Sequence, residues 1–141
     1  MVVEIGSGTR ISPMLAVSDG KAAIDFYISA FGAEELWRID NGGHLVAGLS
    51  VGGAKLFLAT ESPNHGTRAP DIVGHTTVRI ELFVDDPYEV YEKALAAGAI
   101  VRSPVEEHSY PTTGPQPIKQ MLQGVVVDPF GHMWLIGKIL E

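Results

Sequence analysis

The polar residues best placed to bind a ligand are Arg79 and Glu81, which stand in an alternating run over residues 76–84. Side chains two positions apart on a β-strand share a face, so Phe83 lies beside them. The opposite face carries an apolar stripe of Val78, Ile80, Leu82 and Val84. A guanidinium can bind an anionic or carbonyl oxygen through two hydrogen bonds, and a carboxylate can orient it. We expect this pair to anchor a ligand; the alternative is that the two only pair with each other, or with another subunit, and stabilise the sheet.

Other residues capable of chemistry do not form recognisable sets. The chain has no cysteine, which excludes disulfides, thiol nucleophiles and thiolate metal ligands. Its histidines lack the i,i+2 or i,i+4 spacing of a local metal site, and they are His44, His65, His75, His108 and His132. No nucleophile elbow, P-loop or dinucleotide-binding fingerprint is present. The sequence therefore assigns no catalytic residue.

A tight turn near the C-terminus gives the clearest structural signal. Asp128, Pro129, Phe130 and Gly131 separate two β-rich runs. Aspartate suits the first position of such a turn, proline pre-sets φ at the second, and glycine accepts a positive φ at the last. The pattern predicts a β-hairpin that closes the chain. Residues 45–58 follow the same plan, and a short amphipathic helix ending in Gly-Ala precedes each hairpin.

The chain is therefore predicted to contain one βαβββ unit twice, at residues 10–60 and 75–140. Residues 61–74, with two prolines and two glycines, are expected to link the units. Each unit is too small to be stable alone, so we expect one domain over residues 1–141. The predicted fold class is α+β, with the two modules forming a curved mixed sheet around a central cleft. Residues 106–119 are expected to form a long loop, either a lid or a disordered segment.

Composition excludes several classes of function. The 141 residues are 45% hydrophobic and carry a net charge of -7, so a globular core is expected and nucleic acid is a poor partner. No apolar run reaches the roughly 20 residues of a membrane span. The N-terminus lacks a signal-peptide pattern, which favours a cytoplasmic protein without a membrane partner. Edge strands that need cover predict a homodimer.

Three phrases in this pattern resemble a known family. They are AAIDFYISAFGAEE in the first unit, and VDDPYEVYEKALAAGA and DPFGHMW in the second. The phrases resemble the vicinal oxygen chelate superfamily, which comprises glyoxalase I, bleomycin-resistance proteins and extradiol dioxygenases. They are most similar to its PhnB-like branch. The resemblance covers residues 10–139 and implies the fold predicted above.

The resemblance also implies where a metal would lie. Enzymes of this superfamily hold a divalent metal with His, Gln or Glu from the first and last strands of each unit. The matching positions in this chain are Ser12, Phe57, Arg79 and Leu135. Phenylalanine and leucine have no donor atoms, and a guanidinium repels a metal. We therefore expect no metal and no cofactor.

The predicted function is metal-independent binding of a small organic molecule, as in bleomycin-resistance proteins, with sequestration of an antibiotic or metabolite. The predicted ligand-binding residues are Arg79, Glu81, Phe57, Phe83, Trp37, Met133, Leu135, Ser12 and Tyr110. An acidic chain would suit a cationic drug. Two alternatives stay open: a lyase, isomerase or dioxygenase with shifted metal ligands, and a partner-binding dimer whose own side chains fill the cleft. Trp37 and Met133 are alternatively ordinary core residues.

Overall fold

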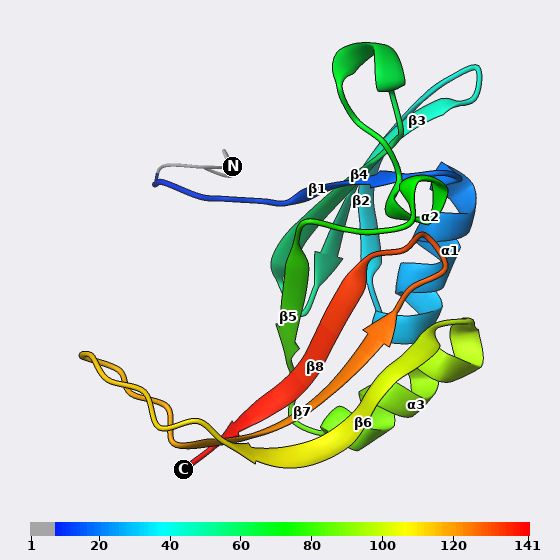
Figure 1. Cartoon of the computed structure of the whole chain (residues 1–141). Helices are drawn as coiled ribbons and strands as arrows, with labels where there is room; N and C mark the ends of the chain where they lie inside the picture. The colour runs from blue at the N-terminus through cyan, green and yellow to red at the C-terminus, as the bar shows by residue number, and fades with distance from the viewer. Residues whose placement is uncertain (1–7) are drawn as a thin grey trace.

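The computed structural model describes residues 8–141, which form two βαβββ modules (Figure 1). The first module contains β1 (Met14–Val17), α1 (Gly20–Phe31), β2 (Glu34–Asn41), β3 (His44–Val51) and β4 (Ala54–Thr60). The second contains β5 (Arg79–Phe83), α3 (Pro87–Ala97), β6 (Ile100–Ser109), β7 (Gln120–Val127) and β8 (Met133–Leu140). Between them the linker forms a 3-10 turn, η1 (Pro63–His65), and a short helix, α2 (Pro70–Val73).

Each module forms its own four-stranded mixed sheet. The strand orders are β1-β4-β3-β2 and β5-β8-β7-β6, and the first strand of each module pairs in parallel with its last. The predicted α+β fold with two βαβββ modules is confirmed. The strands make two separately hydrogen-bonded sheets rather than one, because β1 and β5 are edge strands that share no ladder within residues 8–141.

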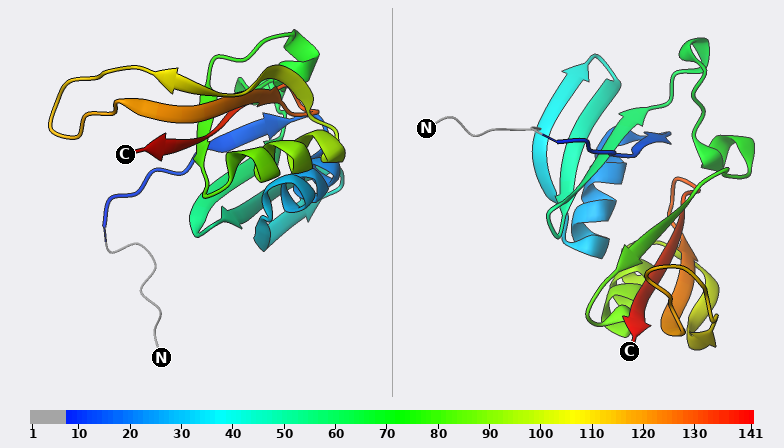
Figure 2. Two further views of the ribbon diagram at one scale, coloured as in Figure 1. Left: turned by 90° about the horizontal axis from the view of Figure 1, so that it is seen from below. Right: turned by 90° about the vertical axis from the view of Figure 1, so that its left-hand side faces the viewer.

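The helices begin and end where capping residues predict. Asp19 accepts a hydrogen bond from the backbone N–H of Ala22 at 3.1 Å, and Asp86 caps α3 in the same way. Gly32 ends α1 in the left-handed conformation. α1 and α3 lie side by side, and their apolar sides join the backs of both sheets in one core (Figure 2). No helix in residues 8–141 is long and apolar enough to cross a membrane.

Strand boundaries differ from the prediction in β1, β5 and β6. Of the alternating run at residues 76–84 only Arg79–Phe83 forms β5, and Val78 of the predicted apolar stripe is 56% exposed before the strand begins. Residues 106–109, expected in a loop, continue β6 because they pair with β7. The loop shrinks to residues 110–119, and the β6–β7 hairpin projects from the body as an arm (Figure 1). Pro104 lies where the ladder of β6 shifts register, a position that suits its missing N–H. β1 begins at Met14 rather than at residue 10, since Pro13 precedes it.

A buried carboxylate joins the two modules. Asp128 is 2% exposed, and its Oδ2 accepts hydrogen bonds from the Tyr27 hydroxyl at 2.5 Å and from Trp134 Nε1 at 2.9 Å. Its Oδ1 accepts from the backbone N–H groups of Phe130 and His132 at 2.9 and 3.0 Å. Tyr27 belongs to α1, whereas the other donors belong to the second module. All four partners are donors, so the carboxylate is satisfied despite its burial.

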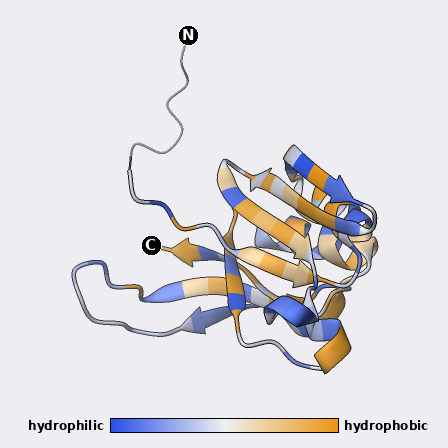
Figure 3. Cartoon of the chain, turned by 90° about the horizontal axis from the view of Figure 1, so that it is seen from above, coloured by the Kyte–Doolittle hydropathy of each residue, from blue (hydrophilic) through white to orange (hydrophobic). Residues whose placement is uncertain are grey.

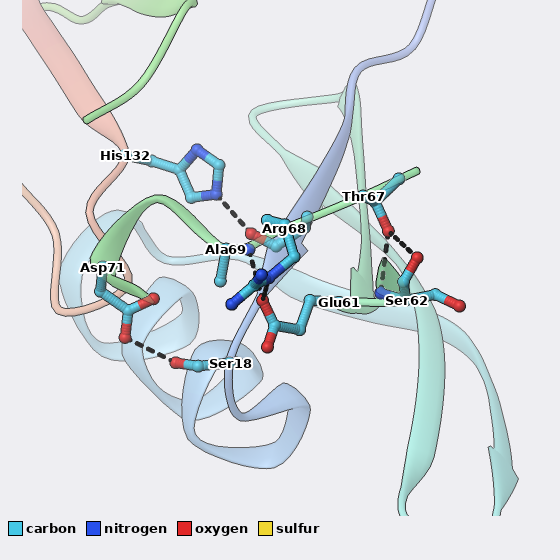
Figure 4. A network of polar contacts seen from close by, with 9 residues as sticks. Ser18, Glu61, Ser62, Thr67, Arg68, Ala69, Asp71 and His132 are labelled. Atoms are coloured by element: carbon cyan, nitrogen blue, oxygen red, sulfur yellow. Dashed lines mark hydrogen bonds and ion pairs between the residues drawn. The ribbon is translucent and has the colours of Figure 1, made fainter. Parts of the chain in front are cut away.

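The linker is hydrogen-bonded to both modules (Figure 4). Asp71 accepts from Ser18 Oγ at 2.7 Å, and its backbone N–H donates to the carbonyl oxygen of Phe130 at 3.0 Å. A direct bond between modules lies beside it, where His132 Nε2 is 2.7 Å from the carbonyl oxygen of Ala16. These contacts fix the turn before β8 against the end of β1.

Glu61 holds the linker in its folded path (Figure 4). Its carboxylate accepts from the backbone N–H of Ala69 at 2.8 Å and from Arg68 Nε at 3.2 Å. The Ala69 N–H, assisted by Arg68, lowers the pKa of Glu61. Residues 61–69 thus close into a compact loop.

We expect Tyr27→Phe to lower the free energy of unfolding by about 1–3 kcal/mol, because it removes one donor from a buried carboxylate. Asp128→Asn should cost more, since its amide group must point N–H donors at donors already in place. Urea denaturation followed by circular dichroism measures both. An Asp128→Asn variant as stable as the wild type would contradict this role.

The pH dependence of the free energy of unfolding separates the contribution of the Tyr27 hydroxyl from that of ring packing. Burial, and then the Asp128 carboxylate, raises the pKa of Tyr27 well above its ordinary value of 10.0. Tyrosine is neutral when protonated, so above pH 10 the unfolded chain releases this proton before the folded chain does. The contribution of Tyr27 is therefore present below pH 10 and lost as pH rises toward the raised pKa. Wild-type stability should fall more steeply above pH 10 than that of Tyr27→Phe.

Candidate functional site

The exposed face of the second sheet carries a pocket of about 380 Å³, here called the cleft pocket. It is lined by Arg79, Glu81, Tyr110, Met121, Gln123 and Leu135. The side chains of β5 alternate as predicted, because Ile80 and Leu82 pack against the core while Arg79 and Glu81 are exposed. The structure thus brings together four of the predicted ligand-binding residues.

Arg79 and Glu81 do not form an ion pair with each other. The salt bridges within residues 8–141 join other residues, and Glu81 Oε1 instead accepts a hydrogen bond from Gln123 Nε2 at 3.3 Å. In the described part of the chain, the Arg79 guanidinium therefore has no carboxylate partner. A cation in this state is suited to bind an oxygen of a ligand.

Met121 and Gln123 were not predicted as pocket residues. They lie on β7, where Val127 pairs with Met133 directly beyond the turn. Counting back from Val127 in steps of two reaches both positions. The strand register that the turn sets would therefore have predicted both residues.

The first sheet presents an aromatic surface. Trp37 is 40% exposed on β2, so it is not a core residue. Its indole lies over Gly48 of β3, where an added Cβ would come within 2.3 Å of the ring. Phe57 of β4 meets Trp37 edge-on, with ring centroids 5.3 Å apart. The missing side chain at Gly48 lets the indole lie against the sheet.

The remaining predicted residues lie around these two surfaces. Phe83 is 50% exposed, and Met133 is half-buried beside Arg79 in the ladder. Ser12 precedes β1 and lines a different cavity, together with Glu81. Tyr110 stacks on His108 at 5.4 Å, and the Tyr110 hydroxyl is 3.1 Å from the Nδ1 atom of that histidine. This pair lies where β6 passes into the loop of the arm, and that loop is mostly polar or neutral (Figure 3).

The donor set does not fit a resident metal. Of the positions that correspond to metal ligands, Phe57 and Leu135 have no donor atoms and Arg79 is a permanent cation. Residues 8–141 contain no group of three or more His, Asp or Glu side chains that would hold a metal ion. His132 is 6% exposed, and its Nε2 already bonds the carbonyl of Ala16.

Two βαβββ modules, each with its own four-stranded mixed sheet, define the architecture of the chain. The chain belongs to the Glyoxalase/Bleomycin resistance protein/Dioxygenase superfamily, whose family model matches residues 10–136. The resemblance drawn from the helix phrases and from DPFGHMW is confirmed at the level of this superfamily.

Individual proteins and solved structures are also similar to this chain. An uncharacterised protein of Mycobacterium bovis is 35% identical over 133 residues, which cover 91% of this chain and 82% of the relative. TioX from Micromonospora sp. ML1 is 27% identical with a TM-score of 0.67, covering 94% of this chain and 100% of TioX. The fosfomycin resistance protein FosX of Listeria monocytogenes, solved with Mn(II) and sulfate, shows the fold alone, at 15% identity and a TM-score of 0.64 over 96% of this chain and 95% of FosX.

We expect Gly48→Ala to lower the free energy of unfolding by about 1–3 kcal/mol, because the new methyl group displaces the Trp37 indole. In a Trp37→Ala background the same change should cost little, since alanine is otherwise no worse than glycine in a strand. A double-mutant cycle from denaturant melts isolates the coupling. An equal loss of free energy of unfolding in both backgrounds would show that the Trp37 indole does not depend on the missing side chain at Gly48.

Proposed function

We propose that this protein binds a small organic molecule without a metal and sequesters it, the ligand being an antibiotic or a metabolite. The observation that carries the proposal is the donor set at the positions where enzymes of the superfamily hold their metal. These positions contain Ser12, Phe57, Arg79 and Leu135. A metal-dependent lyase, isomerase or dioxygenase would need ligands from other residues.

The cleft pocket supplies polar anchors in an apolar setting. Arg79 takes over part of the task of a metal, because its guanidinium can receive an anionic or carbonyl oxygen. Glu81 is held by Gln123 at 3.3 Å and can meet a cationic group of a ligand. Met121 and Leu135 line the same pocket and are 7% and 9% exposed. Apolar neighbours of this kind exclude water and strengthen each polar contact.

The first module supplies stacking surface. Trp37 and Phe57 offer ring faces and edges to a planar group, and such contacts contribute about 0.5–1.5 kcal/mol beyond the burial of area. The first module therefore offers aromatic groups, and the cleft pocket of the second offers charged ones. Within the superfamily we assign the chain to the PhnB-like branch, on the helix-to-strand phrase and DPFGH.

The test uses protein that was purified without a metal-affinity tag and dialysed against a chelator. A thermal-shift screen of aromatic, phosphonate and cationic glycopeptide compounds should still find ligands. Arg79→Met should weaken binding of an anionic hit by about 1.5–3 kcal/mol, the scale of a charged hydrogen bond, with the melting temperature of the free protein nearly unchanged. Calorimetry measures the affinity.

Arg102→Met is the matched control, because Arg102 is an exposed arginine on β6 outside the pocket lining. It should leave affinity unchanged. Binding that disappears on dialysis and returns with one equivalent of zinc, iron, nickel or manganese would overturn metal independence. Equal effects of both substitutions would make Arg79 a structural residue.

We also propose that the protein is a homodimer. β2 is exposed along its whole length, and its apolar side chains Leu36 and Ile39 are 43% and 53% exposed. A second copy would cover this edge, which otherwise offers unpaired backbone groups to other chains. The loop of the projecting arm, residues 110–119, offers a further contact surface (Figure 1).

Sedimentation velocity at micromolar concentration should give about twice the chain mass of 15.1 kDa. Ile39→Lys should shift the protein toward the monomer, because it places a charge on the edge to be covered. Ile72→Lys is the control, since Ile72 is equally exposed, at 52%, on α2. A monomeric wild type would refute the dimer without affecting ligand binding.

A further inference from the structure

A second cavity, of about 510 Å³, lies between the two modules and is here called the seam cavity. One side is formed by the segment before β1 and by the β3–β4 turn. The other side is formed by the middle of β5 and by Trp134. Because β1 and β5 share no ladder, the cavity opens where the two sheets meet. Glu81 lines both this cavity and the cleft pocket, so the two hollows adjoin.

The buried part of the seam cavity lining is apolar. Its walls include Leu56, which is 5% exposed, and Trp134, which is 2% exposed. Ile80 and Leu82 are partly buried and complete this wall from β5. A hydrocarbon or aromatic group placed against these side chains would be removed from contact with water. Each buried methylene contributes about 0.8 kcal/mol to the free energy of binding.

The charge of the seam cavity is opposite to that of the molecule, and the cleft pocket is balanced between one cation and one carboxylate. The chain carries 10 basic and 17 acidic residues, for a net charge of -7. Yet Arg10 and Lys55 line the seam cavity and Arg79 lines the cleft pocket, with Glu81 as their one acidic lining residue. None of these four residues belongs to an ion pair within residues 8–141. The cations are therefore available to a ligand.

We propose that the seam cavity binds an organic anion with an apolar body, such as an aromatic or alkyl carboxylate, sulfonate or phosphonate. The acidic head group contacts Arg10 and Lys55, and the body packs against Ile80, Leu82 and Trp134. This inference rests on the proposed small-molecule binding, because the cavity adjoins the cleft pocket through Glu81. It assigns the ligand class as anionic, in contrast to the cationic drug that the net charge of the whole chain would suit.

Glu81 predicts the direction in which removal of one charge changes the affinity for an anion. Its carboxylate lies in the lining with the two cations and repels an anionic head group, an effect that solvent reduces because Glu81 is exposed. Replacing Glu81 with glutamine should therefore tighten binding of an anion by about two- to fivefold. A neutral ligand of the same shape should not respond.

The test compares two fluorescent probes on the full chain. 8-Anilinonaphthalene-1-sulfonate is an anion with an apolar body, and N-phenyl-1-naphthylamine is its neutral counterpart. The sulfonate should bind with a stoichiometry near one per chain and about tenfold more tightly than the amine. Arg10→Gln and Lys55→Gln should each weaken sulfonate binding about fivefold and leave amine binding unchanged. Added salt should likewise weaken binding of the sulfonate alone.

Lys21→Gln is the matched control, because it removes the same charge from an exposed position on α1 outside both hollows. It should leave both affinities unchanged. Equal binding of the two probes, or equal loss with Lys21→Gln and Lys55→Gln, would overturn the inference. Ligands from the metal-free screen that still respond to Arg79→Met would then show that the proposed function stands without the seam site. Circular dichroism of each variant confirms that folding is intact.

Discussion

The buried carboxylate of Asp128 sets the relation between the two modules. Their sheets share no ladder, so helix packing, the linker, the bond between His132 and Ala16 and this acceptor must hold them together. Tyr27 reaches it from α1, and Trp134 reaches it from β8. The turn that Asp128 opens is also pressed against the linker, because a Cβ on Gly131 would lie 2.5 Å from the backbone nitrogen of Asp71. The seam cavity depends on the module placement that these contacts fix, because residues of both modules line it.

Much of the fold could be predicted because its signals are local. Capping aspartates, glycines after helices and alternation within strands each act over a few residues. The pair Arg79 and Glu81 was found in the same way, from one strand. The role of Asp128 was missed, because Tyr27 stands 101 residues away in the sequence and the aspartate looked like an ordinary turn residue. The extension of β6 was missed for the same reason, since only pairing with β7 defines it.

The exposed sheet faces of the two modules differ, although both modules repeat the same βαβββ unit. In the first sheet Met14 pairs with Phe57 in the parallel ladder, and in the second Glu81 pairs with Leu135. These are matching positions of the two modules. Separate ladders allow each module to change its exposed face without disturbing the register of the other. One copy has an aromatic surface beside Gly48, and the other has a charged pocket.

This asymmetry gives the binding region a direction. A molecule with identical ends would meet equal surroundings in a symmetric pair of modules and would have two equivalent orientations. Under the proposed function, an aromatic group would match the surface of Trp37, whereas an acidic group would match the cations that line the two hollows. A ligand with two unlike ends that reached both modules would then have one favoured orientation, which a simple duplication of the βαβββ unit would not have provided.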